Sequence, residues 1–281
     1  MALPRLPKRD PASNKGDHGK ILVVAGSRGM TGAAVLASEA AYRAGAGLVY
    51  LAVPDSLVSV VGARQTCAVV RGLPEDRGTL GKGASDRILA MLDDMDILAI
   101  GPGLGATGEE IRQVVHSSTR PMVVDADGLN AFAEHPELLG RGSAPRVYTP
   151  HPGELSRLTK KPVEAIQGDR VAHAEEAARR FLGVVVLKGH ETVVTDGAHT
   201  FINKTGNPGM ATGGAGDVLT GVIAALMGQK LGPLDAARLG VHLHGLAGDL
   251  AARKIGPVSL MATDLLDFLP AAIRKHQGGR K

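Results

Sequence analysis

The chain has 281 residues, of which 44% are hydrophobic and 2% aromatic, and its formal net charge is +4. This length and hydrophobic fraction allow one large core, so we expect a single domain over residues 1–281. The shortage of aromatic side chains argues against a stacking platform for nucleic acid. No apolar stretch reaches the roughly 18 residues that a membrane span requires.

Both ends of the chain are rich in basic residues, which we interpret as solvated tails. The N-terminus lacks the apolar run of a signal peptide, and we expect residues 1–19 to be flexible or to lie across a neighbouring subunit. The single cysteine, Cys67, excludes an internal disulfide and a cysteine metal cluster. Its setting, "QTCAVV", favours a small buried side chain over a nucleophile. These features predict a protein of the reducing cytoplasm.

Short apolar runs rich in β-branched residues recur along the chain and predict strands. They cover residues 21–26, 48–53, 96–101, 122–126, 146–150 and 184–189. After the last of them, "TVVTD" and "HTFIN" are close enough in sequence to form an antiparallel hairpin around "GAH".

Ala-rich segments lie between and after these strands and predict helices. They cover residues 33–45, 109–118, 172–183, 216–228, 233–254 and 262–275. The long Ala/Leu-rich run 233–254 is expected to pack on the sheet and brace the helix before it. The alternation predicts an α/β fold with a mostly parallel, doubly wound sheet and helices on both faces. Because ligands bind beyond the carboxyl ends of such strands, the turns found there should line one cleft.

Two of these turns are rich in glycine. "GSRGMTG" (26–32) could present free backbone N–H groups to an anion, but it matches neither the P-loop nor the dinucleotide-binding fingerprint. "GPGLG" (101–105) would let a bulky ligand approach the backbone closely. Each sequence is compatible with a plain tight turn as well as with a binding loop.

Two further turns carry polar side chains. In "TPHPGE" (149–154) two prolines flank His151, which favours a substrate contact over a core position. Glu154 stands at the start of a predicted helix, where it could cap the helix or hold a magnesium-bound water. In "LKGHET" (187–192), Lys188 ends a β-branched run and is either a solvent-exposed strand end or a partner for phosphate.

The strongest motif is "NPGMATGGAGDVLTG" (207–221). Gly213, Gly214 and Gly216 leave backbone amides unobstructed, and the helix that begins near Asp217 adds the positive end of its dipole. This combination predicts a phosphoryl site. Asp217 could be a helix cap, or a base that takes the proton from an attacking hydroxyl. We favour the base, because a cap needs fewer glycines and a carboxylate beside phosphate otherwise adds only repulsion.

With these motifs in order, the chain resembles the ribokinase-like superfamily and, within it, the ADP-dependent NAD(P)H-hydrate dehydratase family. The resemblance covers residues from about 15 to 275. It rests on "MTGAAVLASEAAYRAGAGLV", "GPGLG", "DADGLN", "TPHPGE", "VVLKGHETVV" and "NPGMATGGAGDVLTG". It implies a three-layer α/β/α fold and a repair reaction. In that reaction the S epimer of hydrated NADH or NADPH (NADHX or NADPHX) is dehydrated at the expense of ADP, which gives AMP and phosphate.

The resemblance also implies roles for individual residues. Asp217 would contact the hydrate hydroxyl and act as the base. The implied nucleotide contacts are Lys188, Gly189, His190, Glu191, Thr192, Gly213, Gly214 and Gly216, and the implied hydrate contacts are Gly103, His151 and either Ala40 or Gly45. A magnesium ion is expected near the nucleotide phosphates, with Glu154 holding it through water. Related kinases carry Asn-x-x-Glu where this chain reads "HPGE", so His151 departs from their pattern.

The resemblance further implies a homotetramer and a stand-alone dehydratase, with a separate epimerase for the other hydrate epimer. We expect no nucleic-acid or membrane partner. The sequence leaves two alternatives open. One is a kinase for a vitamin precursor on the same fold, and the other is a nucleotide sensor without catalysis. Asp217 counts against the sensor, because a binding protein gains nothing from a carboxylate that faces phosphate.

Overall fold

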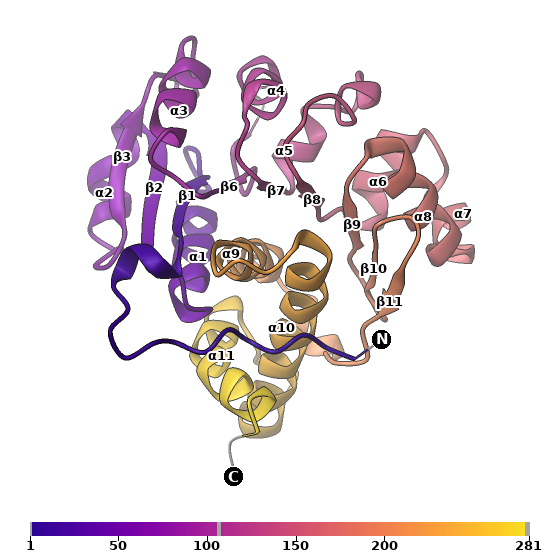
Figure 1. Ribbon diagram of the computed structural model, residues 1–281. Helices are drawn as coiled ribbons and strands as arrows, with labels where there is room; N and C mark the ends of the chain where they lie inside the picture. The colour runs from indigo at the N-terminus through magenta and orange to yellow at the C-terminus, as the bar shows by residue number, and fades with distance from the viewer. Residues whose placement is uncertain (1, 106–107, 279–281) are drawn as a thin grey trace.

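A nine-stranded sheet runs through the computed structural model, which describes residues 2–105 and 108–278 (Figure 1). Across the sheet the order is β11-β10-β9-β8-β7-β6-β1-β2-β3. The strands are β1 (Lys20–Val24), β2 (Leu48–Pro54), β3 (Val69–Leu73), β6 (Ile97–Ile100), β7 (Met122–Val124), β8 (Arg146–Tyr148), β9 (Val184–Leu187), β10 (Val193–Thr195) and β11 (Thr200–Ile202). All pairs from β3 across to β9 are parallel. The β9–β10 and β10–β11 pairs are antiparallel, so the predicted hairpin is confirmed.

Helices cover both faces of the sheet. One face carries α1 (Thr31–Arg43), α2 (Val58–Gly62), α9 (Ala215–Gly228), α10 (Pro233–Ile255) and α11 (Ala262–His276). The other face carries α3 (Ala84–Leu92), α4 (Gly108–Ser117), α5 (Asp127–Asn130), α6 (Pro152–Thr159), α7 (Val163–Gly168) and α8 (Arg170–Phe181). Each face has its own hydrophobic core, and the expected three-layer α/β/α fold is confirmed.

The central strands are buried on both faces, which explains their nearly continuous apolar sequences. Ile21 and Val23 of β1 point into one core, whereas Leu22 and Val24 point into the other. All six strands predicted from such runs are present. Most of them end one or two residues earlier than predicted, so the polar residues that follow them lie in the loops at the carboxyl edge of the sheet.

The apolar pattern does not predict the segment 69–80. Here β3 pairs with β2 at the edge of the sheet, and β4 (Glu75–Asp76) pairs with β5 (Thr79–Leu80) in a separate small hairpin. An edge strand is only partly buried, and β3 accordingly contains the exposed Arg71 and a glycine, Gly72. These residues break the apolar run on which strand prediction depends. The short or amphipathic helices α2, α3, α5 and α7 are likewise not predicted.

The chain order reverses at β1, which lies between β6 and β2. Ligands of doubly wound sheets bind at such a switch point. The loops that follow β1 and β6 meet here, and the Gly26 N–H donates to the Pro102 carbonyl at 2.8 Å. Helix α9, with 12 of its 14 residues buried, packs tightly on α1. Gly221 permits this approach, because a Cβ there would lie 2.0 Å from the Ala37 carbonyl oxygen. Helix α10 packs beside α9 and on the sheet, as predicted.

The N-terminal segment before β1 lies along the chain's own helices α10 and α11 (Figure 1). The Arg238 guanidinium donates to the Ala2 carbonyl, and a ring nitrogen of His276 lies 3.0 Å from the Pro4 carbonyl oxygen. The segment expected to be flexible or to cross a neighbouring subunit therefore has contacts within its own chain. Among the described residues, no helix has the length and apolar character needed to cross a membrane.

Cys67 is exposed, so the prediction of a buried side chain is wrong. The valines that follow it belong to β3, which begins only at Val69. Cys67 instead lies in the loop before β3, where its carbonyl accepts a hydrogen bond from the Tyr42 hydroxyl at 2.9 Å.

Candidate active site

A cavity of about 770 Å³ opens at the carboxyl edge of the sheet, beside the first turn of α9. Its walls come from the loops after β8 and β9, the segment between β11 and α9, and one side of α10. This volume is in the range of small-molecule and cofactor sites. The turns "TPHPGE" and "LKGHET" contribute to the walls, as predicted. Residues of "GSRGMTG" and "GPGLG" do not line this cavity.

The first turn of α9 presents backbone amides beside this cavity. The helix begins at Ala215, and its N-cap is Gly214, which adopts a left-handed conformation at φ 89°. A Cβ at Gly214 would also lie 2.5 Å from the Leu36 side chain, so glycine is required there. The amides of Gly216 and Asp217 form no hydrogen bond within the described residues. Together with the helix dipole, these free amides favour an anion at this position.

Asp217 lies in this first turn but does not cap the helix. The cap position is Gly214, and no side chain accepts a hydrogen bond there. The capping alternative for Asp217 is therefore excluded. Burial, followed by the charge of Asp125, raises the pKa of Asp217 to about 7, although Lys188 opposes this rise. A carboxylate with a pKa near neutrality is suited to accept a proton during a reaction.

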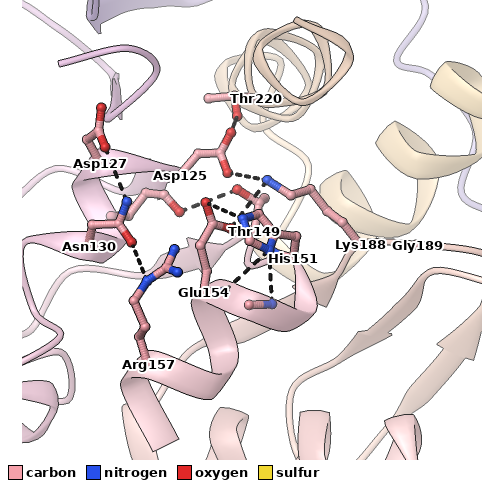
Figure 2. Close-up of polar contacts among 12 residues, drawn as sticks. Asp125, Asp127, Asn130, Thr149, His151, Glu154, Arg157, Lys188, Gly189 and Thr220 are labelled. Atoms are coloured by element: carbon pink, nitrogen blue, oxygen red, sulfur yellow. Dashed lines mark hydrogen bonds and ion pairs between the residues drawn. The ribbon is translucent and has the colours of Figure 1, made fainter. Parts of the chain in front are cut away.

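Lys188 follows β9 and is held between two buried acids (Figure 2). Its Nζ lies 2.6 Å from Asp125 Oδ1 and 3.7 Å from Glu154 Oε2. Burial alone would lower the pKa of Lys188, but the two carboxylates outweigh burial and raise it. The ammonium is therefore charged at neutral pH. A Cβ at Gly216 would lie 3.5 Å from Nζ, so the missing side chain leaves the ammonium next to the free amides.

His151 is the N-cap of α6, and its ring is half exposed at the cavity. Its Nδ1 accepts the N–H groups of Gly153 and Glu154 at 3.0 and 3.3 Å. Burial, with the neighbouring Lys188 and Arg157, lowers the pKa of His151. The ring is therefore neutral at neutral pH, and because Nδ1 accepts, its proton is on Nε2. Nε2 lies 3.4 Å from Glu154 Oε1, so within the described residues it already faces an acceptor.

Glu154 completes the capping box. Its Oε2 accepts the His151 backbone N–H at 2.7 Å, and the residue is only 5% exposed. Burial raises the pKa of Glu154, which Lys188 partly offsets. The capping alternative for Glu154 is thus the one that the structure shows.

Among the described residues, no group of three or more His, Cys, Asp or Glu side chains is placed to hold a metal ion. Glu154 is buried behind the cap, and both oxygens of Asp125 already accept hydrogen bonds, from Lys188 and from Thr220. A lysine ammonium lies between these acids, where a second cation would be repelled. The water-mediated role of Glu154 stays a prediction, and its carboxylate is buried and bonded to the His151 N–H.

The loop from Lys188 to Thr192 connects β9 to β10 along one wall. Gly189, His190 and Thr192 line the cavity with Lys188. Glu191 does not line it and pairs instead with Lys204 on the surface. Four of the five predicted nucleotide contacts in this loop therefore lie at the cavity. The structure places the fifth, Glu191, facing away from it.

The cavity lining is mainly apolar and includes Met210, Leu219 and Val241. One wall of the cavity is the segment 203–207, which is hydrogen-bonded to α10. The Asn203 amide donates to the Val241 carbonyl at 3.2 Å, and the Thr205 hydroxyl donates to the His242 carbonyl at 3.0 Å. Gly245 of α10 allows this close approach, since a Cβ there would lie 2.4 Å from Thr205 Oγ1.

Three predicted hydrate contacts lie outside this cavity. Gly103 is at the same edge of the sheet, under the start of α1, where a Cβ would lie 2.8 Å from that of Ala33. Ala40 is fully buried between α1 and α9. Gly45 follows the far end of α1, at the opposite edge of the sheet, beside Gln229. The structure therefore does not bring Ala40 or Gly45 to the site, because the helix that carries them runs away from it.

Several site residues carry no role in the sequence motifs. Asp125 and Thr220 anchor the charged cluster, and they approach each other only in the folded chain, being 95 residues apart in sequence. His244 is partly buried at the cavity wall, its pKa is lowered by burial to about 4, and its Nε2 lies 2.9 Å from the Ala215 carbonyl oxygen. The neutral ring donates there and steadies the first turn of α9. In the sequence, Asp125 belongs to "DADGLN" and Thr220 to "NPGMATGGAGDVLTG", but neither motif indicates the role of these two residues.

Comparisons with known proteins show the family of this chain. The NAD(P)H-hydrate dehydratase family matches residues 21–271. A bifunctional NAD(P)H-hydrate repair enzyme of Moorella thermoacetica is 48% identical over 276 residues, which is 96% of this chain and 52% of that protein. The chain spans about half the length of the curated relatives it matches.

Solved structures show the same fold. An ADP/ATP-dependent NAD(P)H-hydrate dehydratase of Bacillus subtilis, co-crystallised with ATP and Mg²⁺, has a TM-score of 0.81 at 31% identity, over 97% of this chain and 95% of that one. A ribokinase-like superfamily protein of Enterococcus faecalis has a TM-score of 0.81 at 28% identity, over 97% of this chain and 93% of that one. The ribokinase-like fold is confirmed, and the chain belongs to the NAD(P)H-hydrate dehydratase family.

Proposed function

We propose that the chain dehydrates the S epimer of NADHX or NADPHX at the expense of ADP, giving NADH or NADPH, AMP and phosphate. The observation that carries this proposal is the first turn of α9. Free amides, the Lys188 ammonium and the Asp217 carboxylate meet there beside a cavity large enough for a nucleotide. The family to which the chain belongs supports the choice of substrate.

The proposed reaction has two steps. The ring hydroxyl of the hydrate attacks the terminal phosphorus of ADP, the bond to AMP breaks, and Asp217 takes the hydroxyl proton. The ring nitrogen lone pair then expels phosphate by breaking the ring C–O bond, and loss of a proton from the adjacent ring carbon restores the double bond. The free amides and Lys188 stabilise the charge on the transferring phosphoryl group.

The direct test is recovery of reduced-nicotinamide absorbance from chemically prepared hydrate, with ADP and ATP in parallel. We expect recovery with ADP, and one AMP for each NADH or NADPH restored. If the protein instead phosphorylates a vitamin alcohol and leaves the hydrate untouched, it is a kinase. Nucleotide binding without either reaction would identify a sensor.

We place the adenosine part of the nucleotide in the cavity, between the segment 203–207 and α10. Gly245→Ala should raise the KM for ADP by about tenfold or more with little change in kcat, because the new methyl group displaces the wall away from α10. Gly62→Ala is the matched control, since nothing lies within 4 Å of a Cβ at that helical glycine. An unchanged KM for ADP in Gly245→Ala would mean that the adenosine binds elsewhere.

We assign to His151 a hydrogen bond from Nε2 to the hydrate. His151→Asn keeps a side chain that can cap α6, so it should raise the KM for the hydrate by about tenfold without lowering the Tm. His151→Ala loses the cap as well and should cost about 1 kcal/mol of stability in addition. Measurement of the KM for the hydrate and of thermal unfolding in both variants separates the substrate contact of His151 from its capping role. A wild-type KM for the hydrate in both variants would mean that His151 does not contact the substrate.

We further propose that Mg²⁺ arrives with the nucleotide phosphates rather than at a preformed protein site. The ATP and Mg²⁺ used with the Bacillus subtilis relative support a nucleotide–metal complex. A cytoplasmic homotetramer and an epimerase for the R epimer are also part of the proposal, and they rest on the family resemblance. Light scattering of the purified protein tests the tetramer.

A further inference from the structure

Asp125 is a buried acid at the site to which the proposed reaction gives no role. It follows β7 and is 1% exposed. Its Oδ1 accepts from Lys188 Nζ at 2.6 Å, and its Oδ2 accepts from the Thr220 hydroxyl at 2.8 Å (Figure 2). Both oxygens are therefore used by groups of the site.

These two bonds connect Asp125 to both parts of the phosphoryl site. Thr220 lies three residues after Asp217 on the same face of α9, so its bond fixes the turn that carries the base. The other bond holds the Lys188 ammonium toward Gly216, where a Cβ would lie 3.5 Å from Nζ and 3.8 Å from Asp125 Oδ2. A neutral amide could accept the Thr220 bond equally well, so the bond alone does not explain a buried charge.

We propose that Asp125 is a positioning residue for phosphoryl transfer: it holds Lys188 and the α9 turn in one arrangement and keeps a negative charge beside the turn that carries Asp217. This inference rests on the proposed role of Asp217. Asp125 contacts the reacting groups only through these neighbours, which is why it positions them and does not itself accept the proton.

The surroundings of Asp217 support this division of roles. The charged groups that face it are Asp125, Lys188 and Asp127 of α5. After burial, Asp125 contributes most to the raised pKa of Asp217, and it outweighs the opposing effect of Lys188. From α10, His244 faces the same turn, but its pKa of about 4 keeps it neutral. Losing the charge of Asp125 should therefore make Asp217 more acidic, whether or not Lys188 stays protonated.

The test is the pH profile of kcat/KM for hydrate repair by the full chain. In Asp125→Asn we expect kcat to fall by about 100-fold, and the acid limb to move to lower pH by about one unit. Thr220→Val removes the hydrogen bond to Asp125 and keeps the charge of Asp125. The kcat should therefore fall by about tenfold, with the acid limb at its wild-type pH. If the role of Asp125 were merely structural, the Tm and the activity of both variants would fall, and the acid limb would stay at the wild-type pH in each of them.

The outcomes separate this inference from the proposed function. A wild-type profile without an acid limb near neutrality would remove Asp217 as the base and, with it, the ground for this inference. If the wild type shows this acid limb and Asp125→Asn shows it at the same pH, the role of Asp125 is overturned. The proposed function is then unaffected. If Asp125→Asn does not fold, Asp125→Glu keeps the charge with altered geometry. A fall in kcat with an unmoved limb then supports positioning, and an unchanged kcat contradicts it.

Discussion

Replacing Asp217 by Asn is expected to lower kcat for hydrate repair by about 1,000-fold, because a general base contributes about 10² to 10⁴ to a rate. Asn keeps the size of the side chain, so the KM for ADP should change little. In the wild type, activity should fall tenfold for each unit of pH below about 7, as Asp217 becomes protonated. Steady-state assays from pH 5 to pH 9 measure both effects.

The same substitution should stabilise the protein above neutral pH. The pKa of Asp217 is raised from its ordinary value of 3.8 to about 7 in the folded chain, mainly by burial. Ionisation then favours the unfolded state, so stability that is present below pH 3.8 is lost as the pH rises to about 7. Asp217→Asn escapes this loss. Its Tm should exceed that of the wild type at pH 8, and the difference should shrink toward pH 4.

A variant that is more stable and nearly inactive is the signature of a carboxylate kept for chemistry. Asp264→Asn on α11 is the control, since that acid caps its helix outside the cavity and its loss should lower the Tm while sparing kcat. An Asp217→Asn protein that retains wild-type activity would refute the assignment of the base. Equal Tm values at pH 8 would contradict the pKa assigned to Asp217.

Lys188→Met should have the second-largest effect. It removes the cation nearest the free amides of α9, so kcat should fall by about 10² to 10³. It also leaves Asp125 and Glu154 without their partner in a buried site, which costs about 3–5 kcal/mol of stability. Activity assays at saturating ADP and denaturant unfolding of the same preparation measure the two losses.

The double variant Lys188→Met/Asp125→Asn separates these losses. Because the unpaired charge of Asp125 is gone, much of the stability should return, whereas the activity should not. The matched control is Lys204→Met, which breaks the exposed pair with Glu191 and should leave the stability nearly unchanged. If Lys188→Met kept full activity, the ammonium would have no part in phosphoryl transfer, and its role would be limited to charge balance.

The six central strands could be predicted because burial on both faces makes their sequences continuously apolar. Edge strand β3 could not, since its half-exposed residues remove that signal. Helix α9 was predictable from its apolar run, but its first residue was not. Gly214, and not Asp217, is the N-cap, because only glycine fits against Leu36 in the left-handed conformation.

The site was predictable where local sequence determines geometry and was missed where distant segments meet. The cap formed by His151 and Glu154 is local. The motif "TPHPGE" therefore already indicated helix capping as one of the two roles considered for Glu154. The contact of Asp125 with Thr220 spans 95 positions, and no spacing rule indicates it. The expected Ala40 and Gly45 contacts came from motif resemblance alone. Neither residue lines the cavity, because α1 runs away from it, and the contact stays a prediction.

The central claim is that phosphate leaves with the oxygen of the hydrate hydroxyl, and isotope transfer tests it most directly. Hydrate prepared in ¹⁸O-water carries the label on its ring hydroxyl. During a single turnover with unlabelled ADP, phosphoryl transfer followed by C–O cleavage predicts one ¹⁸O atom in each phosphate released. Unlabelled phosphate, with the ¹⁸O recovered in water, would mean that ADP is hydrolysed separately, and would contradict the proposed roles of Asp217 and the α9 turn in phosphoryl transfer.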